Sequence, residues 1–82
     1  MKIPYFALKD KKLGVFNIAF PAQEGLKKVL VDLERAVKSG EFKYPEDFEL
    51  WQVGEFDNET AVFNVADMPQ KLAAFDDKGG VL

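Results

Sequence analysis

Acidic residues recur at alternate positions in the segment ELWQVGEFDNETAVF, which runs from Glu49 to Phe63. Glu55, Asp57 and Glu59 offer carboxylate oxygens of the kind that hard cations prefer. The spacing lacks the twelve-residue pattern of a calcium loop, and nothing adjacent completes a coordination shell. Asp and Asn favour tight turns because their side chains hydrogen-bond the local backbone. We therefore interpret GEFDNE as the turn of a β-hairpin between strands FELWQV and TAVFNV, with Gly54 at a bulge or sharp twist.

Residue types that usually carry catalysis are missing from the chain. It has no histidine and no cysteine, so the commonest general base and any thiolate metal site are absent. Glu55 and Asp57 would share a strand face, but an exposed turn gives them no desolvated pocket that separates their pKa values. No glycine-rich phosphate loop occurs either. We expect a protein that is not an enzyme and has no catalytic residue, no metal site and no cofactor.

Basic residues form a second candidate site. Two groups contribute, one in the turn of a first hairpin and one early in a helix: Lys9, Lys11, Lys12, Lys27 and Lys28. If the turn and the helix start lie close together, these lysines form one patch, and the neighbouring aromatic residues resemble platforms on which single-stranded bases stack. The formal net charge of −3 argues against strong non-specific binding to nucleic acid. A solvated turn beside ordinary core aromatics remains the alternative.

The third candidate is an apolar surface. Trp51, Val53 and Val62 fall on a second face of the expected sheet, which one helix does not cover. Either the C-terminal segment covers this face, or a partner subunit or ligand does. Because Trp is favoured at interfaces, we expect a homodimer contact through these three residues.

The elements that position these residues follow from periodicity. Residues 2–20 alternate as a first β-hairpin, with Phe16, Ile18 and Phe20 on one face. Leu26, Val29, Leu30, Leu33 and Val37 form the apolar stripe of a helix that ends before Gly40. The resulting order β-β-α-β-β predicts an α+β fold, a four-stranded antiparallel or mixed sheet packed on one helix. We expect a single domain over residues 1–82, with residues 68–82 as a partly ordered C-terminal tail.

No apolar run approaches the roughly 20 residues of a membrane span, and the N-terminal residues MKIPYFALKDKK do not resemble a signal peptide. We therefore expect an intracellular protein that has no membrane partner.

One motif resembles a known family. It comprises Pro45, Glu46, Asp47, Phe48, Leu50, Trp51, Val53, Gly54, Glu55, Phe56, Asp57 and Thr60. This core, after an amphipathic helix and a strand that leads to a proline, is similar to the small nonstructural protein of gokushoviruses, which are microviruses with single-stranded DNA genomes. A glycine often follows the threonine in that family, whereas this chain has Ala61.

The resemblance implies a phage nonstructural accessory protein that assists viral single-stranded DNA synthesis or replication in the cytoplasm of the host bacterium. Its expected partners are single-stranded DNA, a viral or host replication protein, and a second copy of the chain. The alternative is a protein-interaction module that modulates a host factor and does not contact nucleic acid. The resemblance assigns no catalytic residue.

Overall fold

Aromatic and β-branched residues recur in each of the three long strands of the sheet. The computed structural model describes residues 1–82 and contains these elements: β1 (Lys2–Asp10), β2 (Val15–Phe16), β3 (Phe20–Pro21), α1 (Leu26–Lys38), the 3₁₀ turn η1 (Pro45–Asp47), β4 (Phe48–Asp57) and β5 (Val62–Ala74). The expected α+β class and the order of strands before and after one helix are confirmed.

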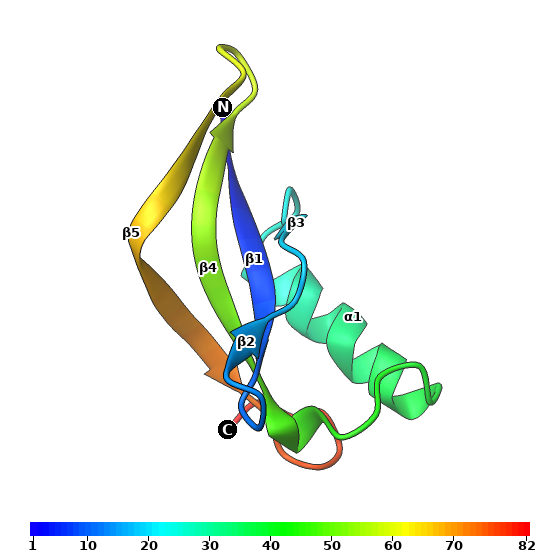
Figure 1. Ribbon diagram of the computed structural model, residues 1–82. Helices are drawn as coiled ribbons and strands as arrows, with labels where there is room; N and C mark the ends of the chain where they lie inside the picture. Colours follow the sequence, from blue (N-terminus) through cyan, green and yellow to red (C-terminus); the bar gives the residue numbers. More distant parts are fainter.

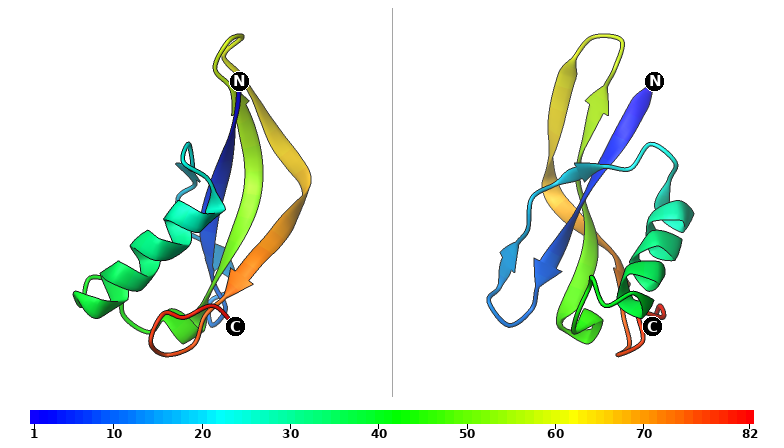
Figure 2. Two further views of the ribbon diagram at one scale, coloured as in Figure 1. Left: turned by 180° about the vertical axis from the view of Figure 1, so that it is seen from behind. Right: turned by 90° about the vertical axis from the view of Figure 1, so that its right-hand side faces the viewer.

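The sheet is antiparallel throughout, in the order β2-β1-β4-β5, and β3 also pairs with β1. β1 and β4 are therefore the central strands (Figure 1). The sheet curls, and α1 crosses one of its faces while the other face has no helix (Figure 2). The single helix spans 13 residues, and no helix has the length and apolar character needed to cross a membrane.

The first hairpin forms, but its second strand is broken. Phe16 pairs with Lys9 and Phe20 pairs with Phe6, and these two residues of β1 point to opposite faces because side chains alternate along a strand. Ile18 lies between the two short strands and is 92 % exposed. The prediction that Phe16, Ile18 and Phe20 share one face is therefore wrong, because one extra residue between β2 and β3 reverses the alternation.

Helix α1 forms where its apolar stripe predicts. Leu26, Val29, Leu30 and Leu33 pack against the core, and Glu34 and Lys38 form an ion pair at 3.4 Å. The helix begins after Gly25, which has a φ of 91° and gives no side-chain cap.

The core lies between α1 and the sheet. It consists of Phe6, Ala22, Leu50, Ala73 and Phe75. Only ten of 82 residues are buried, so the chain encloses a small core, as a short domain must.

The C-terminal segment continues the sheet and then turns toward the core. Residues 68–74 continue strand β5, and Phe75 behind them is only 1 % exposed. Asp76 then accepts hydrogen bonds from the backbone N–H groups of Lys78 (2.9 Å) and Gly80 (2.8 Å). Phe75 also forms an isolated bridge with Val81. Phe75 and Gly79 complete the core on the side of α1, whereas Lys71 pairs with Trp51 in the sheet.

Candidate functional site

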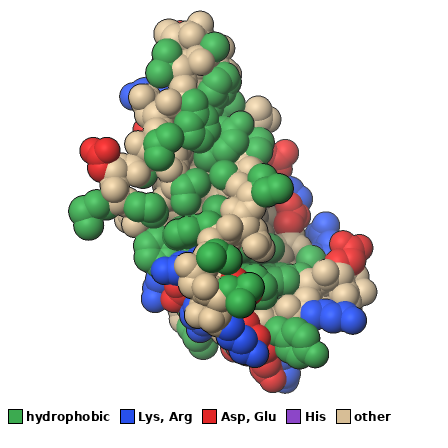
Figure 3. Space-filling view, in the orientation of Figure 1, with side chains coloured by type: hydrophobic (Ala, Val, Ile, Leu, Met, Phe, Trp, Pro, Cys, Tyr) green, Lys and Arg blue, Asp and Glu red, His purple; other side chains and the backbone are tan.

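The face of the sheet without a helix carries a row of aromatic side chains. We call it the Trp51 face and define it by Tyr5, Lys9, Phe16, Trp51 and Phe63. Tyr5, Ala7 and Lys9 alternate onto one side of β1, and Ala7 pairs with Trp51 in β4. Hydrophobic side chains form a continuous band along the sheet, while charged side chains gather toward the end with the β1–β2 turn (Figure 3).

Lys9 lies between two aromatic rings of this face. Its Nζ atom is 5.5 Å from the centroid of the Phe16 ring and 5.2 Å from that of the Trp51 ring. The two rings meet edge to face with centroids 5.8 Å apart. A cation within about 6 Å of a ring centroid is attracted by the ring quadrupole. The contact therefore holds an ammonium group and two aromatic surfaces together on one exposed face.

Glu49 holds the indole N–H group of Trp51. The indole Nε1 donates to Glu49 Oε1 at 3.2 Å, and Lys71 Nζ lies 3.4 Å from Glu49 Oε2. Burial raises the pKa of Glu49, but hydrogen bonds from Trp51 and Lys71, with the charges of Lys71 and Lys11, outweigh it and lower the pKa below its ordinary value. Glu49 therefore stays ionised and orients Trp51, Lys71 and the nearby positive charge.

A second aromatic pair extends the same face. The rings of Tyr5 and Phe63 meet edge to face with centroids 4.8 Å apart. Gly54 permits this arrangement, because a Cβ atom there would lie 2.7 Å from the Asn64 carbonyl oxygen and 3.0 Å from the Phe63 ring. The expected irregularity at Gly54 is confirmed, since the β1–β4 and β4–β5 registers both shift beside it.

The predicted lysines do not form one patch. Lys9, Lys11 and Lys12 lie at or near the β1–β2 turn, whereas Lys27 and Lys28 lie at the start of α1, far from that turn in both views (Figures 1 and 2). Lys12 pairs with Asp47 at 3.2 Å, and Lys28 pairs with Asp32 at 2.8 Å. Only the first group adjoins the Trp51 face.

The three predicted interface residues do not share a face. Val62 pairs with Asp57, next to the pair Phe56–Phe63, so alternation places Val62 opposite to the side that carries Phe63 and Trp51. Val53 is the extra residue of β4 at the register shift and has no partner in either neighbouring strand. Sequence alternation alone missed this because a bulge changes which face each later residue occupies.

The acidic segment proves to be structural at its turn. Asp57 Oδ1 accepts a hydrogen bond from the backbone N–H of Glu59 at 2.9 Å, and the Asp57 carbonyl accepts one from Ala61 at 2.8 Å. The Glu59 carboxylate lies 2.7 Å from the N-terminal ammonium group. The N–H of Glu59 lowers the pKa of Asp57 against a smaller opposing effect of burial, and the N-terminal ammonium, the N–H of Thr60 and Lys2 add to the lowering.

The turn is shorter than expected, and no metal cluster forms around it. Gly54–Asp57 belong to strand β4 rather than to the turn, and Thr60 precedes the start of β5 at Val62. No group of three potential metal-ligating side chains lies close together anywhere in the structure.

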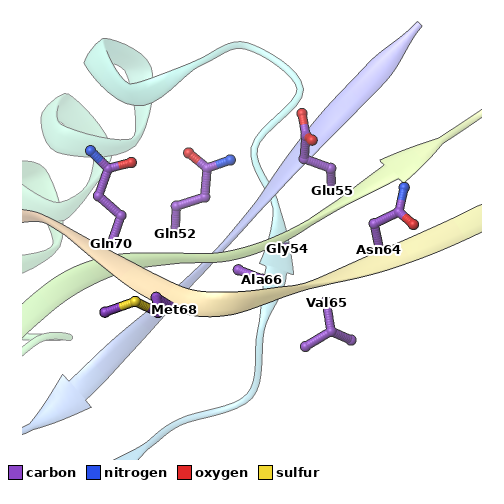
Figure 4. Close-up of a pocket in the computed structure, with 8 residues that line it drawn as sticks. All are labelled: Gln52, Gly54, Glu55, Asn64, Val65, Ala66, Met68 and Gln70. Carbon is purple, nitrogen blue, oxygen red and sulfur yellow. The ribbon is translucent and has the colours of Figure 1, made fainter.

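An open pocket of about 240 Å³ lies where β5 bends away from β4. The side chains of Gln52, Glu55, Asn64 and Gln70 point to one side of these strands, and Val65 points to the other (Figure 4). The pocket offers carboxamide groups and one carboxylate, which can donate and accept hydrogen bonds. It lies mainly on the side of α1, away from the Lys9 contact.

Sequence reasoning found the members of the Lys9 contact but not the contact itself. Lys9 and Phe16 were considered for a nucleic-acid site, whereas Trp51 was assigned to a separate apolar interface. The cross-strand neighbours Phe63 and Lys71 were missed. A detectable signal was the alternation of Tyr5, Ala7 and Lys9, which places a lysine and an aromatic residue on one face of β1.

Comparison with protein families identifies the chain. A model described as Phage ORF5 protein matches residues 3–78. The chain belongs to the Phage ORF5 protein family. Comparison with curated proteins finds no significant match, and comparison with solved structures finds none. The Trp51 face thus belongs to an ORF5-family phage protein, and every residue that defines it lies within the matched range.

Proposed function

We propose that this ORF5-family protein is a non-enzymatic gokushovirus accessory protein that binds single-stranded DNA on its Trp51 face. It would act in the cytoplasm of the host bacterium and assist viral single-stranded DNA synthesis. One observation carries the proposal: the Lys9 ammonium group lies 5.5 Å and 5.2 Å from the centroids of two solvent-accessible aromatic rings.

This geometry suits a single strand better than a duplex. Bases of a single strand expose their faces, and stacking on an aromatic side chain contributes about 1–3 kcal/mol per base. Phe16 is 41 % exposed and Trp51 is half-buried, so both rings are anchored while part of each surface stays open. The duplex hides these base faces, and its tight binding needs many phosphate contacts.

The charge of the face limits the strength of binding. Lys9 and Lys11 lie beside the aromatic contact, and Lys71 is held there by Glu49. For single strands, each neutralised phosphate contributes about 0.7 to the slope of log affinity against log salt. Three lysines therefore predict a slope of about −2, in keeping with a protein whose net charge is −3.

The sole tryptophan of the chain makes the test specific for this face. The full-length protein is titrated with an oligothymidylate at low salt while the fluorescence of Trp51 is followed. We expect quenching that saturates, together with the shallow salt dependence given above. No quenching and no retention of oligonucleotide at low salt would contradict the proposal.

A matched pair of variants separates the two lysine groups. Lys9→Glu and Lys27→Glu change the net charge equally, but only Lys9 contacts the aromatic rings. We expect Lys9→Glu to weaken binding about tenfold or more, because it removes the cation and places a carboxylate over the rings. Lys27→Glu should change affinity about twofold or less. An equal loss in both variants would assign binding to overall charge and not to the Trp51 face.

A second candidate function is a protein-interaction module for a viral or host replication protein. It is favoured by Leu13 and Ile18, which are 73 % and 92 % exposed and are not aromatic. Affinity purification from infected cells, with and without nuclease, tests this function. A specific partner that survives nuclease and is lost with Ile18→Lys supports it, whereas a partner released by nuclease indicates association through nucleic acid.

A further inference from the structure

The β4–β5 hairpin projects beyond the part of the sheet that α1 covers. We call its outer part, residues 54–65, the arm. Its only sheet neighbour is the beginning of β1, which pairs with β4 from Lys2 to Tyr5. Figure 2 shows the arm extending away from the helix, with no element over either face. The arm is therefore uncovered on both faces. A short ribbon of this kind gains little stability by itself.

One edge of the arm is open along its full length. β5 pairs with β4 and with no other strand, so its outer edge presents backbone N–H and C=O groups without strand partners. Natural edge strands are protected by charges, prolines or bulges. In β5 these devices lie at Asp67, Pro69 and Lys71 and at the bend before Gln70.

The outer half of β5 has no such protection. Residues 60–66, TAVFNVA, contain no charged residue and no proline, although 30 % of the chain is charged. Val62 is 50 % exposed, Phe63 is 43 % exposed and Val65 is 75 % exposed. An uncharged, apolar and open edge is a template for pairing with another strand.

We propose that a second copy of this chain occupies the edge, with segment Val62–Ala66 of each copy paired antiparallel about a two-fold axis. A two-fold axis through the pair of Asn64 residues places Phe63 of one copy opposite Val65 of the other and Val62 opposite Ala66, so that opposed side chains lie on the same face of the sheet. The same register places Asp67 opposite Ala61 and Glu59 opposite Pro69, so no like charges meet. The segment is thus complementary to itself, which a symmetric interface requires.

This dimer differs from one formed through Trp51. Antiparallel pairing about an axis perpendicular to the sheet continues the sheet from one copy into the next. Both Trp51 faces then lie on the same side of the joined sheet and stay open. The interface does not include Lys9, Phe16 or Trp51, so each proposal can fail without the other.

Cysteine crosslinking tests the position of the axis, because the natural chain contains no cysteine. Asn64→Cys places one thiol beside the proposed axis. Ser39→Cys places one at the end of α1, on an exposed residue outside the arm. Under mild oxidation we expect Asn64→Cys to form a covalent dimer on a non-reducing denaturing gel and Ser39→Cys to stay a single chain. Equal crosslinking of the two variants would overturn the proposal.

Sedimentation velocity tests the interface in the unmodified protein. We expect wild type to sediment at twice the chain mass of 9.3 kDa. Val65→Lys should shift the species to a single chain, because it adds a charge to the paired edge. Ile18→Lys is the matched control, since Ile18 is more exposed than Val65 but lies outside the arm, and it should keep the wild-type mass. Circular dichroism confirms that each variant is folded.

Two sedimentation results would overturn the proposal. One is a wild-type protein that stays a single chain at concentrations of several hundred micromolar. The other is a dimer that survives Val65→Lys and dissociates with Trp51→Arg, which would assign the contact to the Trp51 face.

Discussion

Ala61 holds a backbone conformation that its side chain disfavours. Its φ is 60°, in the left-handed region of the β4–β5 turn, and its backbone N–H closes the turn onto Asp57. Glycine adopts this region at little cost, whereas an L-residue with a Cβ atom is strained there by about 1–2 kcal/mol. The turn therefore forms in spite of Ala61, through the hydrogen bonds of Asp57.

At this residue we predict that Ala61→Gly stabilises the protein. Relief of strain outweighs the added freedom of glycine in the unfolded chain, so the free energy of unfolding should rise by about 0.5–1 kcal/mol. Urea denaturation followed by circular dichroism measures the change. Thr60→Gly is the control, because Thr60 has a negative φ and should lose stability on the same substitution. A lower stability of Ala61→Gly would contradict the strain at this position.

At the scale of elements, α1 is held by the end of the chain as well as by the sheet. Gly79 lies so close to α1 that a Cβ atom there would be 2.8 Å from Val37 Cγ2. Its φ of 84° also excludes most other residues. The backbone N–H groups of Lys78 and Gly80 donate to Asp76 and fix the turn that contains Gly79. They thereby hold Gly79 in contact with the helix.

A comparison of two glycines isolates that packing. Gly79 and Gly40 both have φ near 80°, but a Cβ atom at Gly40 would meet nothing within 4 Å. We expect Gly40→Ala to cost about 1–2 kcal/mol from backbone strain alone. Gly79→Ala should cost a further 1–3 kcal/mol, roughly, because the added methyl overpacks Val37. Equal losses in thermal denaturation would mean that the turn does not pack against α1.

The elements also show how far sequence reasoning reaches. The stripe from Leu26 to Leu33 predicted α1 because a helix needs only local periodicity, and the aromatic alternation predicted both hairpins. The face of the sheet on which each side chain lies was less predictable. One extra residue between β2 and β3 puts Phe16 and Phe20 on opposite faces, and Val53 is an unpaired residue within β4. Such bulges depend on pairing with distant strands. The Lys9 contact depends on that register too, so its residues were found separately and not together.

At the scale of the whole molecule, two carboxylates stabilise opposite ends of the β4–β5 hairpin. Glu49 links β4 to β5 and to the lysines of the Trp51 face, and Asp57 closes the turn of the arm. The pKa of each is lowered in the folded protein from 4.5 for Glu49 and 3.8 for Asp57. The unfolded chain therefore binds these protons first as the pH falls. Their stabilising effect is complete above the unfolded values and is lost as the pH falls through the folded ones.

We predict that acid weakens the fold partly through Glu49. Urea denaturation of wild type should give a lower free energy of unfolding at pH 3 than at pH 7. Glu49→Gln should be less stable than wild type at pH 7, and the difference between them should shrink as the pH falls below 4.5, the ordinary pKa of Glu49. A difference that stays constant over this range would show that its ionisation does not stabilise the fold.

The pairing of β1 with β4 has a consequence for how the protein is made. Lys2 pairs with Asp57 and Asp10 pairs with Phe48, so β1 is synthesised well before β4, its main partner. Meanwhile β2, β3 and α1 are synthesised with no β4 to complete their core. Long-range pairing of this kind slows folding. The nascent chain thus carries exposed aromatic residues until residues 48–57 emerge, and chaperone demand should peak in that interval.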